Sequence, residues 1–242
     1  MKLLRPLALF VTVALLGACH SGAAAAPKPQ PTRLGEIPEA YRELWKAWLL
    51  RDPRYTALRE AALQDPHQTI FLVENLVSVL LGEITAGRVD TEANGLPTTL
   101  GRVRRELVEI GPQSAPALAE VLPLGLGLGP VAVEDLLVQI GSPAVGPILE
   151  QLKRKDSDLA RRRAAKALAA MADRGIPAGA PASEVREALG QCLLHDSDWI
   201  VRSQSALALA PWGRRSAADM ADSSRFLVPS LKDPDASVRT DV

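Results

Sequence analysis

The stretch DSDLARRRAAKAL, residues 156–168, decides the fold, because it recurs twice further along the chain. It returns as DSDWIVRSQSALAL at 196–209 and, shortened, as DPDASVR at 233–239. The arginines at the same place in the pattern, Arg161, Arg202 and Arg239, are 41 and then 37 residues apart. Repetition at a period of about 20–50 residues predicts a repeat architecture in which each unit is one supersecondary motif.

Each copy has the composition of a helix start. An Asp side chain accepts hydrogen bonds from the free N–H groups of a first helical turn, so Asp156, Asp196 and Asp233 are predicted to cap the helices that follow them. The second acidic residue of each copy favours the positive end of the helix. The Ala and Leu residues that come next recur at helical spacing and let two helices approach closely.

Two upstream segments match the other half of such a unit. LVEIG at 107–111 and LVQIG at 137–141 both end in glycine and precede a proline-containing run. Glycine ends helices in a left-handed turn and proline suits a first helical turn. The predicted helix ends are Gly111, Gly141 and Gly213, and the prolines are Pro112 and Pro143. First helices are predicted near 100–110, 130–140, 157–172, 197–211 and 235–242, and second helices near 113–122, 143–154, 183–194 and 223–232, with longer loops at 173–182 and 213–221.

These segments, spanning residues 100–242, resemble HEAT repeats, especially the bacterial kind first described in phycobilisome lyases. The resemblance implies an all-α fold, an α-solenoid of stacked antiparallel helix pairs, because a single pair has too little apolar surface to fold alone. It also implies that the repeat arginine reaches an Asp of the adjacent unit. The repeat residues are Asp156, Arg161, Asp196, Arg202, Asp233 and Arg239. The first copy departs from the pattern by having Ala160 where the others have valine, and the last repeat is incomplete after Arg239.

Residues 37–99 are predicted to form an N-terminal helical cap without an obvious repeat. Helices are expected over 37–50, 53–63 and 67–86, with a loop at 87–99 that contains Asn94-Gly95. The third helix is broadly apolar, but Glu74 and Asn75 interrupt it, so it is not expected to cross a membrane.

The N-terminus carries a secretion signal. Lys2 and Arg5 precede the apolar run LALFVTVALL at 7–16, which is too short to span a bilayer. Leu16-Gly17-Ala18-Cys19 resembles the lipobox of bacterial lipoproteins, which implies a signal peptide at 1–18 and acylation of Cys19, palmitate being one such group. Residues 19–36 are predicted to form a flexible Ala- and Pro-rich tether. By the same resemblance, His20 after the cysteine favours the outer membrane over the inner, with the domain facing the periplasm or the exterior.

Charge and cysteine content narrow the classes of function. The chain has 28 basic and 28 acidic residues, and the net charge becomes −2 when Lys2 and Arg5 leave with the signal. This balance gives no electrostatic case for nucleic acid. With Cys19 acylated, Cys192 has no partner for a disulfide.

No set of residues has the spacing of a catalytic or metal site. His20, His67 and His195 lie far apart and outside any metal-binding motif. Cys192 sits on the apolar side of a predicted helix, as a small core residue does. The run Gly125 to Pro130 lacks the lysine of a phosphate loop. We therefore expect a non-enzyme, with no cofactor and no small-molecule substrate.

The function predicted from these features is a membrane-anchored scaffold for protein–protein interaction in the bacterial cell envelope, with an unidentified protein partner. The alternative is a lyase- or chaperone-type accessory that acts on a partner protein. The expected contacts are polar residues of the second helices and the basic cluster beside them: Glu150, Lys153, Arg154, Arg162, Arg163, Arg186 and Gln191. For the basic cluster two interpretations stay open, namely a grip on an acidic partner or lipid head group, and a structural role in helix ends and inter-repeat pairs.

Overall fold

The computed structural model describes residues 38–87, 98–124, 129–176 and 182–242, and every regular element within these ranges is helical. Two 3₁₀ turns, Gly111–Gln113 and Ser142–Ala144, precede the helices α5 and α7. The helices are α1 Glu39–Leu50, α2 Tyr55–Ala62, α3 Pro66–Thr85, α4 Thr99–Ile110, α5 Ala115–Val121, α6 Gly129–Ile140, α7 Val145–Leu152, α8 Asp158–Asp173, α9 Ala182–His195, α10 Trp199–Gly213, α11 Ala217–Ser230 and α12 Ala236–Asp241. The predicted signal peptide, Cys19 and the tether lie outside the described residues.

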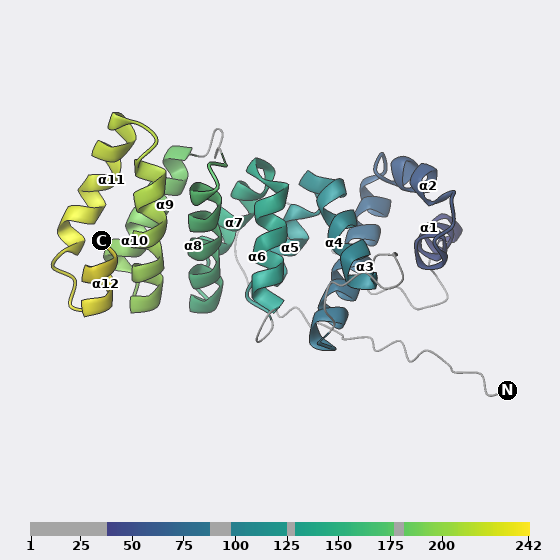
Figure 1. The fold of residues 1–242 in the computed structure, drawn as a ribbon, viewed down its shortest axis with the longest axis horizontal. Coiled ribbons are helices and arrows are strands. Elements are labelled where there is room, and N and C mark those ends of the chain that lie inside the picture. The colour runs from purple at the N-terminus through teal and green to yellow at the C-terminus, as the bar shows by residue number, and fades with distance from the viewer. Residues whose placement is uncertain (1–37, 88–97, 125–128, 177–181) are drawn as a thin grey trace, which may run out of the picture. The chain divides into compact units, whose positions relative to one another are not determined.

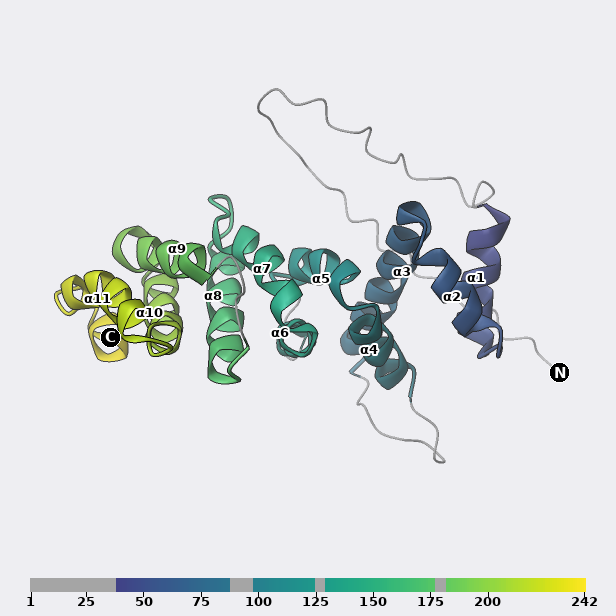
Figure 2. The same ribbon diagram turned by 90° about the horizontal axis from the view of Figure 1, so that it is seen from above.

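The helices from α4 onward lie in two layers that follow the chain in order. Figures 1 and 2 show α4, α6, α8, α10 and α12 side by side in one layer, with α5, α7, α9 and α11 behind them in the other. Each first helix packs against the first helix of the next unit. The second helices α5, α7 and α9 pack against the first helix that follows them, and α11 packs against α10. The predicted all-α solenoid of antiparallel helix pairs is therefore confirmed.

The caps of the first helices differ from the prediction. The capping side chains are Ser157 for α8, Asp198 for α10 and Asp235 for α12, each accepting a first-turn N–H at 2.8–3.1 Å. Asp196 and Asp233 instead accept the N–H two residues later, at 2.9 and 2.8 Å, which shapes the turn before the helix. At these two positions the first Asp of the repeat is thus a turn residue, and both of its carboxylate oxygens also accept from an arginine.

The glycine predictions divide. Gly111 and Gly141 have φ of 65° and 80°, the left-handed turn expected of them. The prediction of a left-handed turn at Gly213 is wrong. Gly213 is the last residue of α10 and lies against Ser223 of α11. The loop predicted at 213–221 is also wrong: Ser216 caps α11 by accepting the N–H of Asp219 at 3.0 Å, so the helix begins at Ala217.

Small residues allow the first helices to pack closely. In α8 the side chains that face the core are Ala160, Ala164, Ala165, Ala167, Leu168, Met171 and Ala172. Trp212 of α10 is fully buried in the space beside them, and its indole N–H donates to the carbonyl of Leu168 at 3.0 Å. The largest core side chain therefore has its one polar group satisfied.

The helix α3 has the length and apolar composition of a membrane span, as has the pair formed by Val131–Ile140 and Ser142–Leu152, which bends by 119°. The buried face of α3, however, packs against α4. It consists of Thr69, Leu72, Val73, Leu76, Val77 and Leu80. One apolar core thus runs from the N-terminal helices into the repeats.

The contact between α9 and α11 is unusually close, and it yields a test of the packing. A Cβ built on Gly190 would lie 2.4 Å from the ring of Phe226, whereas a Cβ on Gly146 of α7 meets nothing within 4 Å. We expect Gly190→Ala to lower the free energy of unfolding by about 1–3 kcal/mol, since overpacking forces a shift. Gly146→Ala is the matched control, and should raise stability by up to about 1 kcal/mol because alanine is the better helix former.

Urea denaturation of both variants measures these changes. Phe226→Leu in the Gly190→Ala background should recover part of the loss, because it removes the ring that the new methyl group meets. Equal effects of the two glycine substitutions would contradict the close packing of α9 on α11.

Candidate functional site

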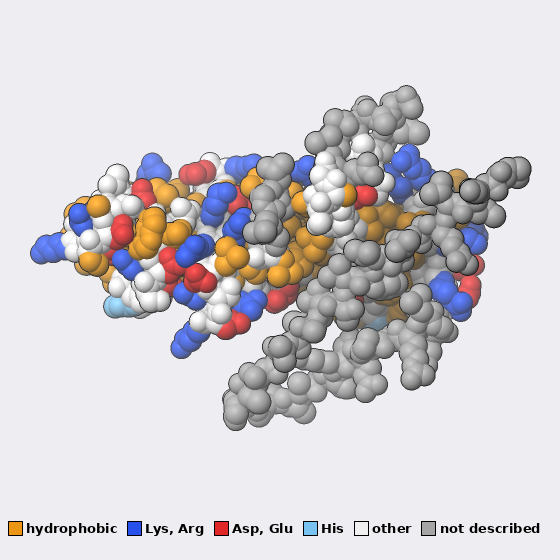
Figure 3. Space-filling model, turned by 90° about the horizontal axis from the view of Figure 1, so that it is seen from below, with side chains coloured by type: hydrophobic (Ala, Val, Ile, Leu, Met, Phe, Trp, Pro, Cys, Tyr) orange, Lys and Arg blue, Asp and Glu red, His pale blue; other side chains and the backbone are white. Residues whose placement is uncertain are grey.

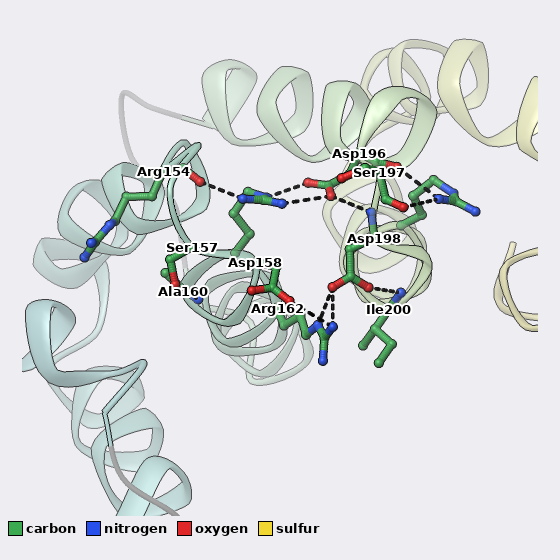
Figure 4. A network of polar contacts seen from close by, with 11 residues as sticks. Arg154, Ser157, Asp158, Ala160, Arg162, Asp196, Ser197, Asp198 and Ile200 are labelled. Carbon is green, nitrogen blue, oxygen red and sulfur yellow. Dashed lines mark hydrogen bonds and ion pairs between the residues drawn. The ribbon is translucent and has the colours of Figure 1, made fainter.

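The repeat arginine links one unit to the next. Nε and Nη2 of Arg161 lie 2.6 and 3.0 Å from the two carboxylate oxygens of Asp196, and its Nη1 donates to the carbonyl of Arg154 at 2.9 Å (Figure 4). The guanidinium therefore ties the turn before α8 to the turn before α10. Two parallel hydrogen bonds to one carboxylate fix orientation as well as distance.

The next repeat has the same arrangement. Nε and Nη2 of Arg202 lie 2.8 and 3.0 Å from the carboxylate of Asp233, and Nη1 donates to the carbonyl of Asp196 at 3.0 Å. Arg239 donates to the carbonyl of Asp233 at 2.6 Å, which is the own-turn half of the pattern. The three arginines thus play equivalent parts in three successive turns.

These pairs are largely shielded from water. The side chains of Arg161 and Asp196 are 13% and 6% exposed, and those of Arg202 and Asp233 are 13% and 7% exposed. The hydrogen bonds from Arg202 hold the pKa of Asp233 below its usual value. The carboxylate of Asp233 therefore remains charged at neutral pH and keeps its pairing with Arg202.

Other ion pairs join neighbouring units within each layer. In the first layer Arg104 pairs with Asp135, Lys166 with Glu134, and Arg162 with Asp198. In the second layer Lys153 pairs with Glu184 and Arg225 with Glu187. Several charged side chains that the sequence suggests are free surface groups therefore form ion pairs between neighbouring repeats.

These ion pairs involve some of the residues that were predicted to contact a partner protein. Arg186 is only 9% exposed, and its guanidinium pairs with Asp219 at 2.7 Å and Asp222 at 3.1 Å, so it joins α9 to α11 and is not a surface contact. Arg162 lies on the first-helix layer, bound to Asp158 and Asp198. Arg154 pairs with Asp156 at 2.8 Å.

The other predicted contacts lie nearer to water. Glu150, Lys153 and Gln191 are exposed on the second-helix layer, while Arg163 is half-buried on α8. Glu150 accepts a hydrogen bond from Lys153 at 3.3 Å. Gln191 donates to Glu187 at 2.8 Å, four residues back along α9.

A groove of 590 Å³ lies between α7 and α9, and we call it the α7/α9 groove. The residues that line it are Leu152, Lys153, Lys155, Arg161, Glu184, Glu187, Ala188, Gln191, Cys192, His195, Asp196 and Ser197. Its volume is within the range of about 300–1,000 Å³ in which ligand sites fall. Figure 3 shows the molecule from the side of the turns, where basic, acidic and His side chains surround hydrophobic patches.

The groove brings together two of the predicted contacts, Lys153 and Gln191, with residues that sequence reasoning did not select. Lys155 and His195 are the most informative of these, because each directly precedes the first Asp of a repeat. Lys232 occupies the same place before Asp233. A basic residue before the repeat Asp is thus the signal that could have located this edge.

Cys192 lines the groove without the features of a nucleophile. Burial raises the pKa of its thiol to about 11, and the charge of Asp196 acts in the same direction. The thiol is therefore protonated at neutral pH, and a protonated thiol is a poor nucleophile. In the described part of the chain, no group of three or more His, Cys, Asp or Glu side chains is placed to hold a metal ion.

The comparisons with known proteins agree with the repeat geometry. Residues 145–242, which comprise α7 to α12, match the family model of HEAT repeats. No curated protein and no solved structure matches the chain. The fold and the matched residues define an all-α HEAT-like solenoid, whose C-terminal part is similar to HEAT repeats.

The pairing of Arg202 with Asp233 leads to a pH-dependent prediction. Asp233→Asn removes the charge opposite a largely buried guanidinium, and should lower the free energy of unfolding at neutral pH by about 1–3 kcal/mol. The pKa of Asp233 is lower in the folded chain than its usual 3.8, so the pair stabilises the fold above that pH and the benefit is lost as the pH falls through the folded pKa.

Urea denaturation at pH 7 and at several lower pH values measures this effect. The difference between Asp233→Asn and wild type should shrink as the pH drops below the usual pKa of aspartate. Asp173→Asn, at an exposed site at the end of α8, is the control and should change stability little. A difference that is the same at every pH would contradict the ion-pair account.

Proposed function

We propose that this chain is a membrane-anchored HEAT-repeat lipoprotein that serves as a non-catalytic scaffold for protein–protein interaction in the bacterial cell envelope. HEAT-like repeats support the interaction role, because stacked helix pairs present an extended surface. The observation that carries the proposal is the α7/α9 groove on the second-helix layer of such a stack.

The inter-repeat ion pairs support a scaffold rather than a flexible chain. Arg161 and Arg202 each hold the next turn by two hydrogen bonds to one carboxylate. A surface whose repeats are fixed in this way loses little conformational entropy when it binds a partner. The groove therefore offers a preorganised site for a protein segment.

The anchor rests on the sequence of the N-terminus. A basic start, an apolar run at 7–16 and the tetrapeptide ending in Cys19 are together the pattern of a lipoprotein signal. Several acyl chains hold a protein on a bilayer, at about 0.8 kcal/mol per buried CH₂, whereas one chain binds only reversibly. His20 beside the cysteine favours the outer membrane as the destination.

Cys19→Ser tests the anchor. The wild-type chain, expressed in a bacterium with the lipoprotein pathway, should be found in the membrane fraction, with an acyl mass on its N-terminal peptide in mass spectrometry. The variant should lose both the acyl mass and the membrane association, because serine carries no thiol to acylate. Cys192→Ser is the matched control and should change neither. An unmodified, soluble wild-type chain would refute the anchor.

Site-directed photocrosslinking in the full-length chain tests the scaffold. A photoreactive amino acid is placed at exposed sites of the second-helix layer, Glu120, Glu150 and Arg225, and at sites of the first-helix layer, Gln139, Lys166 and Leu207. We expect one discrete partner band from the second layer and weaker or no bands from the first. A smear of equal strength from both layers, or no adduct at any site, would contradict the proposed function.

A further inference from the structure

The α7/α9 groove has an apolar lining with two basic side chains at one end. The half-buried Ala188 and Cys192 contribute apolar surface, and the buried Leu152 lies beneath them. Lys155, in the turn after α7, and His195, at the end of α9, are both exposed and form no ion pair with a described residue. The groove thus combines apolar contact area with unneutralised positive charge.

The other charges of the groove are neutralised within the protein. Lys153 lies 2.6 Å from Glu184, Arg161 pairs with Asp196, and Glu187 accepts from Arg225. What remains for a ligand is the positive charge of Lys155, and the exposed ring of His195 belongs to the same lining.

The groove is open because the spacing of the second helices is uneven. Phe226 sits directly on the backbone of Gly190, which brings α11 close to α9. The contact between α7 and α9 is much less extensive. A glycine facing a large ring brings α9 and α11 together, and no such contact joins α7 and α9, where the groove lies.

We infer that the α7/α9 groove binds an acidic, extended segment of the partner protein. An apolar side chain of that segment packs against Ala188 and Cys192, and neighbouring carboxylates lie near Lys155 and His195. This inference rests on the proposed scaffold function and adds the chemistry of the segment that is recognised. Charge complementarity to the unpaired Lys155 and the apolar lining both select such a segment.

Fluorescence polarisation with a defined peptide tests the inference on the full-length chain. The probe is fluorescein-labelled Gly-Ser-Leu-Glu-Leu-Glu-Ser-Gly with an amidated C-terminus. One comparison peptide has Gln in place of Glu, a second has Ser in place of Leu, and a third keeps the first sequence with a free C-terminal carboxylate. The probe should bind more tightly than the Gln and Ser peptides. Tighter binding of the free-acid peptide would assign the carboxylate to a chain end rather than to a side chain.

Charge reversal within the groove supplies the matched comparison. The double variant Lys155→Glu, His195→Glu should weaken binding of the probe by roughly tenfold, since each exposed charge contributes up to about 1 kcal/mol. Lys232→Glu reverses the equivalent charge of the next repeat outside the groove lining, and should leave binding within about twofold. Ala188→Trp fills the groove without changing its charge and should abolish binding. Thermal unfolding of each variant shows that the fold is retained.

The outcomes separate this inference from the proposed function. If the second layer yields a partner band that persists in the double variant and in Ala188→Trp, the scaffold stands and the groove assignment is overturned. Equal binding of all peptides, or equal weakening by Lys232→Glu, overturns it as well. If the band disappears in the groove variants and not in Lys232→Glu, and the peptide series follows the expected order, the inference is supported.

Discussion

The paired hydrogen bonds from a repeat arginine to the next repeat's aspartate set how the units of this protein stack. A helix pair with an alanine-rich face has little apolar area to bury, so its position relative to the next pair needs a directional contact as well as burial. Arg161 and Arg202 supply that contact, each with one further bond to a carbonyl of its own turn. The turn before each helix is thereby fixed from both sides.

This stacking also decides which charges remain available to a partner. Ion pairs run between neighbouring units in the first layer, the second layer and the turns. These pairs occupy many of the charged side chains of the described repeats, although the chain as a whole has 28 basic and 28 acidic residues. An exposed charge without an ion pair, such as that of Lys155, is available to bind a partner, because the neighbouring charges are already paired.

Uneven spacing of the second helices creates a groove that a regular stack would lack. Gly190 admits the ring of Phe226 and draws α11 onto α9, while α7 and α9 leave 590 Å³ between them. The proposed binding site therefore lies where the spacing between second helices departs from that of a regular stack. The same departure explains why Cys192, which the sequence places among core residues, is half-buried and lines the groove.

The sequence by itself determined the fold class, most helix positions and the repeat arginines, because helix caps, apolar periodicity and the glycine turns act within a few residues. It misplaced the start of α11, since Ser216 caps a helix whose first turn, Ala217 to Asp219, has no strong apolar period. Only the tertiary structure decided that Arg186 is buried between two helices and that Lys155 and His195 meet at one groove. Those outcomes depend on the distance between units far apart in the chain, which is set by packing and not by local pattern.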